Sequence, residues 1–106
     1  MAKFEKVKIA GQELNIKFGF NALAVFEKES GESISGLGNY GDNIPIRVAI
    51  CLVYAGLKDG ARVSKSEFKL TKEDVADLLD DDGQALNRVM KVFSDMMGDK
   101  KKAIRK

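Results

Sequence analysis

A run of three aspartates followed by a glycine, residues 80–83, is the part of this sequence best suited to bind a metal ion. Carboxylates next to a glycine at a sharp turn are typical of a calcium-binding EF-hand loop. With Gly83 at the glycine position, however, Leu78 and Val89 would take the first and last ligand positions, and neither side chain carries an oxygen. We therefore predict a helix junction here, in which one aspartate caps the helix that follows.

The residue types that nucleophilic catalysis needs are missing or isolated. The chain has no histidine and one cysteine, Cys51, which lies in the apolar run 48–53. Such a cysteine is expected to be a small buried hydrophobic residue rather than a reactive thiol. The glycine-rich stretch 36–41 matches a phosphate-binding loop only loosely, because no strand is predicted before it. Carboxylates such as Glu27 and Glu73 fall on predicted exposed faces. We expect no enzymatic activity, no cofactor and no metal.

Composition and charge indicate one soluble domain. The chain has 106 residues, of which 44% are hydrophobic and 32% charged, as in ordinary globular proteins. Its 18 basic and 16 acidic residues give a net charge of +2, which is too balanced for the whole domain to bind nucleic acid. The sequence contains no signal peptide and no apolar run of membrane-spanning length. We expect a cytoplasmic protein without a membrane partner.

Residues 3–18 have the pattern of a β-hairpin. Val7 and Ile9 alternate with lysines, and a second alternating run follows a turn that contains Gly11. Each strand would place one apolar face on a core and one charged face in water. Because a two-stranded hairpin is marginal alone, it must pack on helices or pair with another chain. Its exposed edge predicts self-association.

Helix start and stop signals follow the hairpin. Asn21 is predicted to cap a short amphipathic helix that runs through Ser30. After a glycine-rich loop, residues 36–43, a proline begins a broadly apolar central helix. Gly56 and Gly60 are expected to bracket the end of that helix, and a polar connector is expected from residue 58 to residue 70.

Two more helices complete the predicted fold. Thr71 and Asp74 have the spacing of a capping box at the start of one, and the last helix is expected to end at Gly98. The predicted fold class is α+β and mostly helical, with the hairpin packed on about four helices in residues 21–97. Residues 1–98 would form a single globular domain, and residues 99–106 a flexible basic tail.

Methionine and phenylalanine side chains recur on one face of the last predicted helix. They have two interpretations, core packing or an adaptable apolar surface for a partner, and methionines suit the second because they repack easily. The basic residues 100–106 could contact phosphates, although the aromatic residues of a base-stacking platform are missing. The candidate partner-interface residues are Tyr54, Val89, Met90, Phe93 and Met97.

Three segments, in this order, resemble the tail assembly chaperone family of long-tailed bacteriophages. They are residues 20–34 with the motif FEKESG, the helix end LVYAGL at residues 52–57, and LTKEDVADLL at residues 70–79. The resemblance implies a non-enzymatic protein that binds the tape measure protein and helps to recruit tail tube subunits. It also implies that the protein acts in the host cytoplasm and is absent from the mature virion.

Two other classes of function remain open. A structural tail or head-completion protein would stay in the virion, and mass spectrometry of purified particles would detect it. A small regulatory protein that binds nucleic acid through residues 100–106 would shift DNA or RNA in a salt-dependent way.

Overall fold

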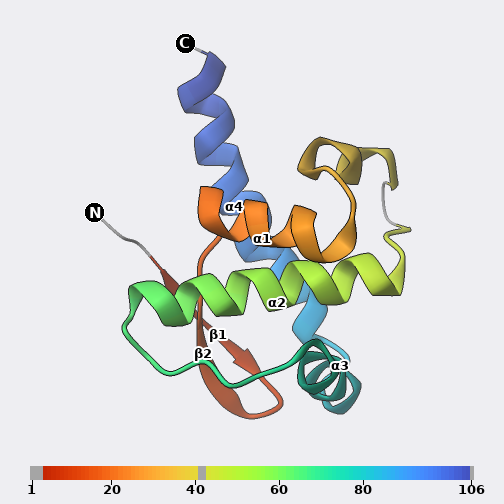
Figure 1. Cartoon of the computed structure of the whole chain (residues 1–106), viewed down its shortest axis with the longest axis vertical. Coiled ribbons are helices and arrows are strands. Elements are labelled where there is room, and N and C mark those ends of the chain that lie inside the picture. Colours follow the sequence, from red (N-terminus) through yellow and green to blue (C-terminus); the bar gives the residue numbers. More distant parts are fainter. Residues whose placement is uncertain (1–3, 41–42, 106) are drawn as a thin grey trace.

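A computed structural model describes the backbone of residues 4–40 and 43–105, and their side chains as far as residue 97. It confirms the predicted fold class, because an antiparallel hairpin packs on a set of helices (Figure 1). The elements are β1 (Glu5–Ile9), β2 (Gln12–Ile16), α1 (Phe20–Ser30), the 3-10 helix η1 (Ile34–Tyr40), α2 (Ile46–Val63), α3 (Lys72–Asp81) and α4 (Ala85–Arg105).

The hairpin has the predicted alternation. A two-residue turn joins its strands, and Ala10 and Gly11 in that turn have φ angles of 51° and 81°. Positive φ at both positions is typical of the type I′ turn, whose twist matches that of paired strands. Val7, Ile9 and Ile16 are buried, so one face of the hairpin belongs to the core.

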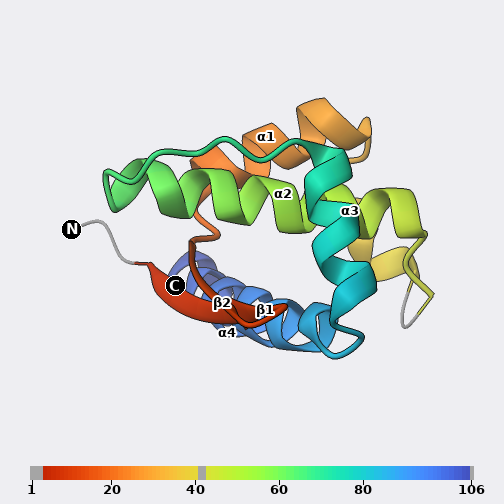
Figure 2. The same cartoon turned by 90° about the horizontal axis from the view of Figure 1, so that it is seen from below.

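Helix α2 crosses the centre of the molecule, with α1 on one side and the hairpin on the other (Figure 2). Its predicted end near Gly56 and Gly60 is wrong, because the helix continues to Val63. The Lys17 N–H donates a 3.0 Å hydrogen bond to the Gly56 carbonyl, and a Cβ on Gly60 would overlap the backbone of Asn15. The two glycines therefore let the hairpin approach the helix backbone.

The start of α1 also differs from the prediction. Gly19, not Asn21, is the N-cap residue, and no side chain accepts a hydrogen bond there. Asp59 of α2 lies close by, because a Cβ placed on Gly19 would be 4.0 Å from its Oδ2 atom. The Lys17 ammonium group lies nearer still, 2.7 Å from the same point, so the Lys17–Asp59 ion pair rather than a lone carboxylate lies beside the start of α1. At the other end Gly31, with φ of 75°, ends the helix as predicted.

The stretch predicted as a loop, residues 36–43, contains regular structure in its first part. It lies largely in the 3-10 helix η1, whose last residue, Tyr40, donates a 3.0 Å hydrogen bond from its hydroxyl to Glu32. Residues 41–42 of the predicted loop lie outside the described residues. Pro45 directly precedes α2 as its N-cap residue.

The predicted capping box at α3 is confirmed. The Asp74 N–H donates to the Thr71 hydroxyl at 3.1 Å, and the Thr71 N–H donates to the Asp74 carboxylate at 2.9 Å. The predicted capping of the last helix by an aspartate stays a prediction, because α4 begins at Ala85 and Asp82 is the C-cap residue of α3. Asp82 accepts a 3.2 Å hydrogen bond from the Gln84 N–H through its side chain.

Helix α4 extends further than predicted. It passes through Gly98, where the sequence predicted its end, and its helical backbone continues to Arg105. One glycine costs a helix only about 1 kcal/mol relative to alanine, and most of the residues that follow are good helix formers. The end of α4 projects beyond the other helices (Figure 1).

Asp82 also joins the α3–α4 junction to the hairpin. It accepts hydrogen bonds from Arg88 at 2.8 Å and from the Ala10 N–H in the hairpin turn at 3.0 Å. The same guanidinium nitrogen of Arg88 donates to the Lys8 carbonyl at 2.9 Å. The hydrogen bond from Arg88, followed by that from Ala10, lowers the pKa of the Asp82 carboxyl below its ordinary 3.8.

The lowered pKa predicts how stability depends on pH. The folded state binds the charged form of Asp82 better, so this stabilisation is present above pH 3.8 and is lost as the pH falls through the lower folded pKa. We expect Asp82→Asn to lower the free energy of unfolding at neutral pH. The difference from the unaltered chain should shrink in strong acid. Urea unfolding of both chains over a pH series measures this, and a difference that stays constant with pH would contradict it.

Candidate partner-binding surfaces

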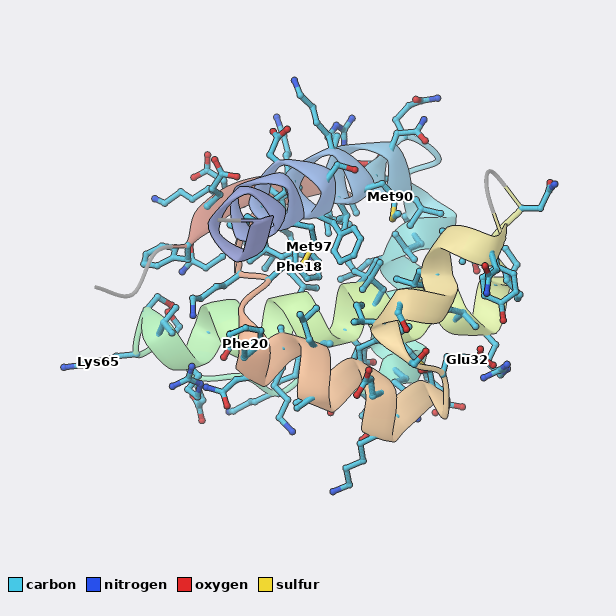
Figure 3. The ribbon with its side chains drawn as sticks, turned by 90° about the horizontal axis from the view of Figure 1, so that it is seen from above. Phe18, Phe20, Glu32, Lys65, Met90 and Met97 are labelled. Atoms are coloured by element: carbon cyan, nitrogen blue, oxygen red, sulfur yellow. The ribbon has the colours of Figure 1, made fainter. Side chains whose placement is uncertain are left out.

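The interface residues predicted on α4 do not all reach the surface. Val89 is 0% exposed and belongs to the core, so it is wrong as a contact residue of the folded domain. Met90, Phe93 and Met97 are partly exposed. Figure 3 shows Met90 and Met97 on the side of α4 that faces α1. Met90 and Phe93 pack against the core, so only part of the side chains of Met90, Phe93 and Met97 is open to a partner.

The same face of α4 holds the hairpin to the helices. Phe18 follows β2, and its ring lies edge-on to Phe93 with 5.1 Å between centroids. The Phe18 N–H lies 3.2 Å from the Met96 sulfur. The stripe therefore packs on the core, and the interpretation as a partner surface stays a prediction that concerns the exposed parts of Met90, Phe93 and Met97. We refer to the partly exposed residues Met90, Phe93 and Met97 as the α4 face.

Tyr54, the fifth predicted residue, belongs to a separate aromatic cluster. It lies on α2, and its ring contacts Phe68 in an edge arrangement with 5.6 Å between centroids. The ammonium group of Lys58 lies 5.9 Å from the centre of the Tyr54 ring. Phe68 comes from the connector, which begins after Val63 rather than at residue 58 and runs back along α2 to α3 (Figure 2).

Two grooves open beside the connector, and Phe68 lines both. The β2 groove, about 380 Å³, lies between β2, the connector and the α2 residues Leu57 and Ala61. The α1–α2 groove, about 540 Å³, lies between the first half of α1 and the last turns of α2. Its apolar and charged lining residues include Ala24, Val25, Lys58, Asp59, Arg62 and Phe68.

Asp59 is a buried carboxylate at the edge of the α1–α2 groove. It is 3% exposed, and its Oδ1 accepts a 2.8 Å hydrogen bond from Nε of Arg62. The ammonium group of Lys17 lies 3.8 Å from Oδ2, which has no hydrogen-bond partner among the described residues. A buried charge is tolerated when it is paired, so the two cations explain how Asp59 can lie in this position.

Local sequence patterns contain little signal for this second site. Asp59 and Arg62 are three residues apart on α2, which is typical of an ordinary exposed ion pair. The available signal was the spacing of Gly56 and Gly60, because small residues four apart mark a helix face that another backbone approaches closely. A carboxylate next to such a face is a candidate for burial.

Metal binding, thiol chemistry and membrane insertion have little support in the described part of the chain. No group of three or more histidine, cysteine or acidic side chains there is placed to hold a metal ion. Cys51 is buried as predicted, and burial raises the pKa of its thiol. Among the described residues, no helix has the length and apolarity that a bilayer crossing requires.

Comparison of the chain with family models, with curated proteins and with solved structures finds no match. The resemblance to tail assembly chaperones therefore depends on residues 20–34, 52–57 and 70–79 of the sequence alone.

Proposed function

We propose that this protein is a non-enzymatic tail assembly chaperone that binds a tape measure protein and helps to recruit tail tube subunits. It would act in the host cytoplasm and be absent from the finished virion. The observation that best supports the proposal is the α4 face, with partly exposed Met90, Phe93 and Met97 on a helix that extends past the domain. Apolar side chains that repack easily suit a surface that must accept several similar segments of one partner.

The physical argument concerns exposed apolar surface. A long helical tape measure protein exposes apolar stripes until the tail tube surrounds it, and contiguous exposed stripes promote aggregation. A small domain could cover these stripes with modest affinity per contact if many copies bind along one chain. Self-association between copies remains a prediction. Part of the predicted free edge of the hairpin is covered, because β2 packs on α2.

Co-expression with the tape measure protein encoded nearby tests the proposal. We expect the partner to be soluble and to co-purify only when this chain is present. Met97→Glu should weaken the complex about tenfold, because it places a charge in an apolar contact. Lys91→Glu, which changes an exposed residue on the same helix, is the control and should bind normally. Isothermal titration or a quantitative pull-down measures both variants.

Three results would contradict the proposal. The tape measure protein could stay insoluble despite co-expression, or Met97→Glu and Lys91→Glu could bind equally well. Alternatively, mass spectrometry could find the chain in purified virions, which would favour the structural alternative. A thermal melt of each variant separates lost binding from lost folding.

A further inference from the structure

The α1–α2 groove combines an apolar lining with excess positive charge. Ala24, Val25 and Phe68 supply its apolar side chains. Lys58 and Arg62 line it as well. The one acidic lining residue, Asp59, is buried and already faces two cations, Arg62 and Lys17. Glu67 of the connector lines the other groove and pairs with Lys69 at 3.4 Å. The charge that a ligand meets in the α1–α2 groove is therefore positive.

Arg62 is held in a position from which it can bind a carboxylate. Its Nε donates to buried Asp59, while its side chain is 55% exposed. A guanidinium group has five N–H donors in a fixed plane, and the bond to Asp59 uses only the one on Nε. The two terminal nitrogens of Arg62 have no hydrogen-bond partner among the described residues. An arginine fixed through Nε keeps its terminal nitrogens for a carboxylate and loses little side-chain entropy when it binds one.

We propose that the α1–α2 groove binds a segment of the tape measure protein in which apolar side chains lie beside carboxylates. The proposal rests on the function proposed above and adds a specific site to it. The apolar side chains of the segment would contact Val25 and Phe68, and its carboxylates would pair with Arg62 and Lys58. Asp59 is then a positioning residue, which acts through Arg62 rather than by touching the partner.

The charge pattern would give this site a selectivity that the α4 face lacks. An apolar contact alone accepts any apolar segment. An arginine that loses its water without gaining a carboxylate partner, by contrast, disfavours the binding of neutral or basic segments. The groove would therefore select which stretches of a long partner are bound, and the α4 face would add apolar contact area.

Overlapping peptides that tile the tape measure protein test the site, with fluorescence anisotropy as the readout. We expect the peptides that bind to contain carboxylates next to apolar residues. Arg62→Gln should weaken their binding about tenfold or more, and Lys58→Gln by a smaller factor. Arg47→Gln is the control, because Arg47 lies on the same helix about 22 Å away and also pairs with a carboxylate, that of Glu32. Arg47 also donates a 2.7 Å hydrogen bond to the Ser30 carbonyl at the end of α1, so a thermal melt must show that this variant stays folded. Arg47→Gln should leave the affinity unchanged.

The salt dependence of binding distinguishes a direct role of Arg62 from a structural one. The affinity of the unaltered chain should fall as salt is added, and that of Arg62→Gln should depend on salt less steeply. Asp59→Asn should reduce the affinity while leaving the salt dependence in place, because Arg62 remains but is less well positioned. Arg62→Gln also removes the hydrogen bond to buried Asp59 and can therefore change the fold near the groove. Lys58→Gln tests the same surface without removing that hydrogen bond.

The results separate failure of the site from failure of the function. If the full-length tape measure protein co-purifies but Arg62→Gln and Lys58→Gln bind it as well as Arg47→Gln does, the groove is not the site and the function stands. Binding peptides that show no preference for carboxylates would also overturn the site. If neither the peptides nor the full-length protein bind, both the proposed function and the site are wrong.

Discussion

Phe18→Ala should destabilise this protein by about 3–5 kcal/mol, the usual cost of removing a buried phenylalanine. Phe18 is 1% exposed and lies where the hairpin, α2 and α4 meet. Its ring packs edge-on against Phe93 and would touch any Cβ placed on Gly56, at 2.5 Å. Its loss would leave a cavity bounded by three elements, none of which can close it without moving the others. Urea unfolding followed by circular dichroism measures the change.

The chain offers a matched control two residues away. Phe20→Ala removes the same atoms from a side chain that is 74% exposed at the start of α1. We expect it to lower the free energy of unfolding by about 1 kcal/mol at most, because most of this ring stays in water in the folded state. Equal losses for the two variants would show that the junction of the hairpin, α2 and α4 is not a packing centre of the fold.

Local patterns predicted much of this fold. Alternation in residues 3–18 identified the hairpin, the Thr71–Asp74 spacing identified a capping box, and Gly31 ends α1 as expected. These features depend on residues a few positions apart, so the sequence displays them directly. Cys51 was correctly assigned to the core because the run around it is apolar.

The wrong predictions share a physical cause, which is contact between residues far apart in the chain. Asn21 is an excellent capping residue, yet α1 begins one residue before it, where the backbone lies beside the Lys17–Asp59 ion pair. A glycine within a helical pattern can mark the end of the helix or a place where another backbone packs closely on it. For α2, the position of β2 shows that the second explanation applies. Val89 has the spacing of the methionines around it but faces inward.

The two candidate sites also differ in whether local sequence patterns or contacts between distant segments reveal them. Met90, Phe93 and Met97 were chosen as candidates because helical spacing places them on one face of a predicted helix. The α1–α2 groove was not, because α1, α2 and the connector each supply part of its lining. Phe68 had the appearance of an isolated apolar residue in a polar stretch, and its role depends on the path by which the connector returns along α2.

Gly60→Ala should destabilise the protein by about 2 kcal/mol, although alanine is the better helix former by about 1 kcal/mol. The added Cβ would overlap the backbone carbonyl of Asn15, and a backbone group cannot rotate away as a flexible side chain can. Either β2 shifts from α2 or the helix bends. Both would strain the adjacent hydrogen bond from Lys17 to the Gly56 carbonyl and the 3.0 Å bond from Asn15 to Ser64. Thermal or urea unfolding gives the size of the loss.

Gly83→Ala is the appropriate comparison, since a Cβ there would meet no atom within 4 Å. It should leave stability unchanged or raise it slightly, because alanine restricts the unfolded chain more than glycine does. If Gly60→Ala were as stable as Gly83→Ala, β2 would not rest on the α2 backbone. The α1–α2 groove would then lose its support as well, because that contact brings Lys17 to Asp59, and Asp59 in turn holds Arg62 at the groove.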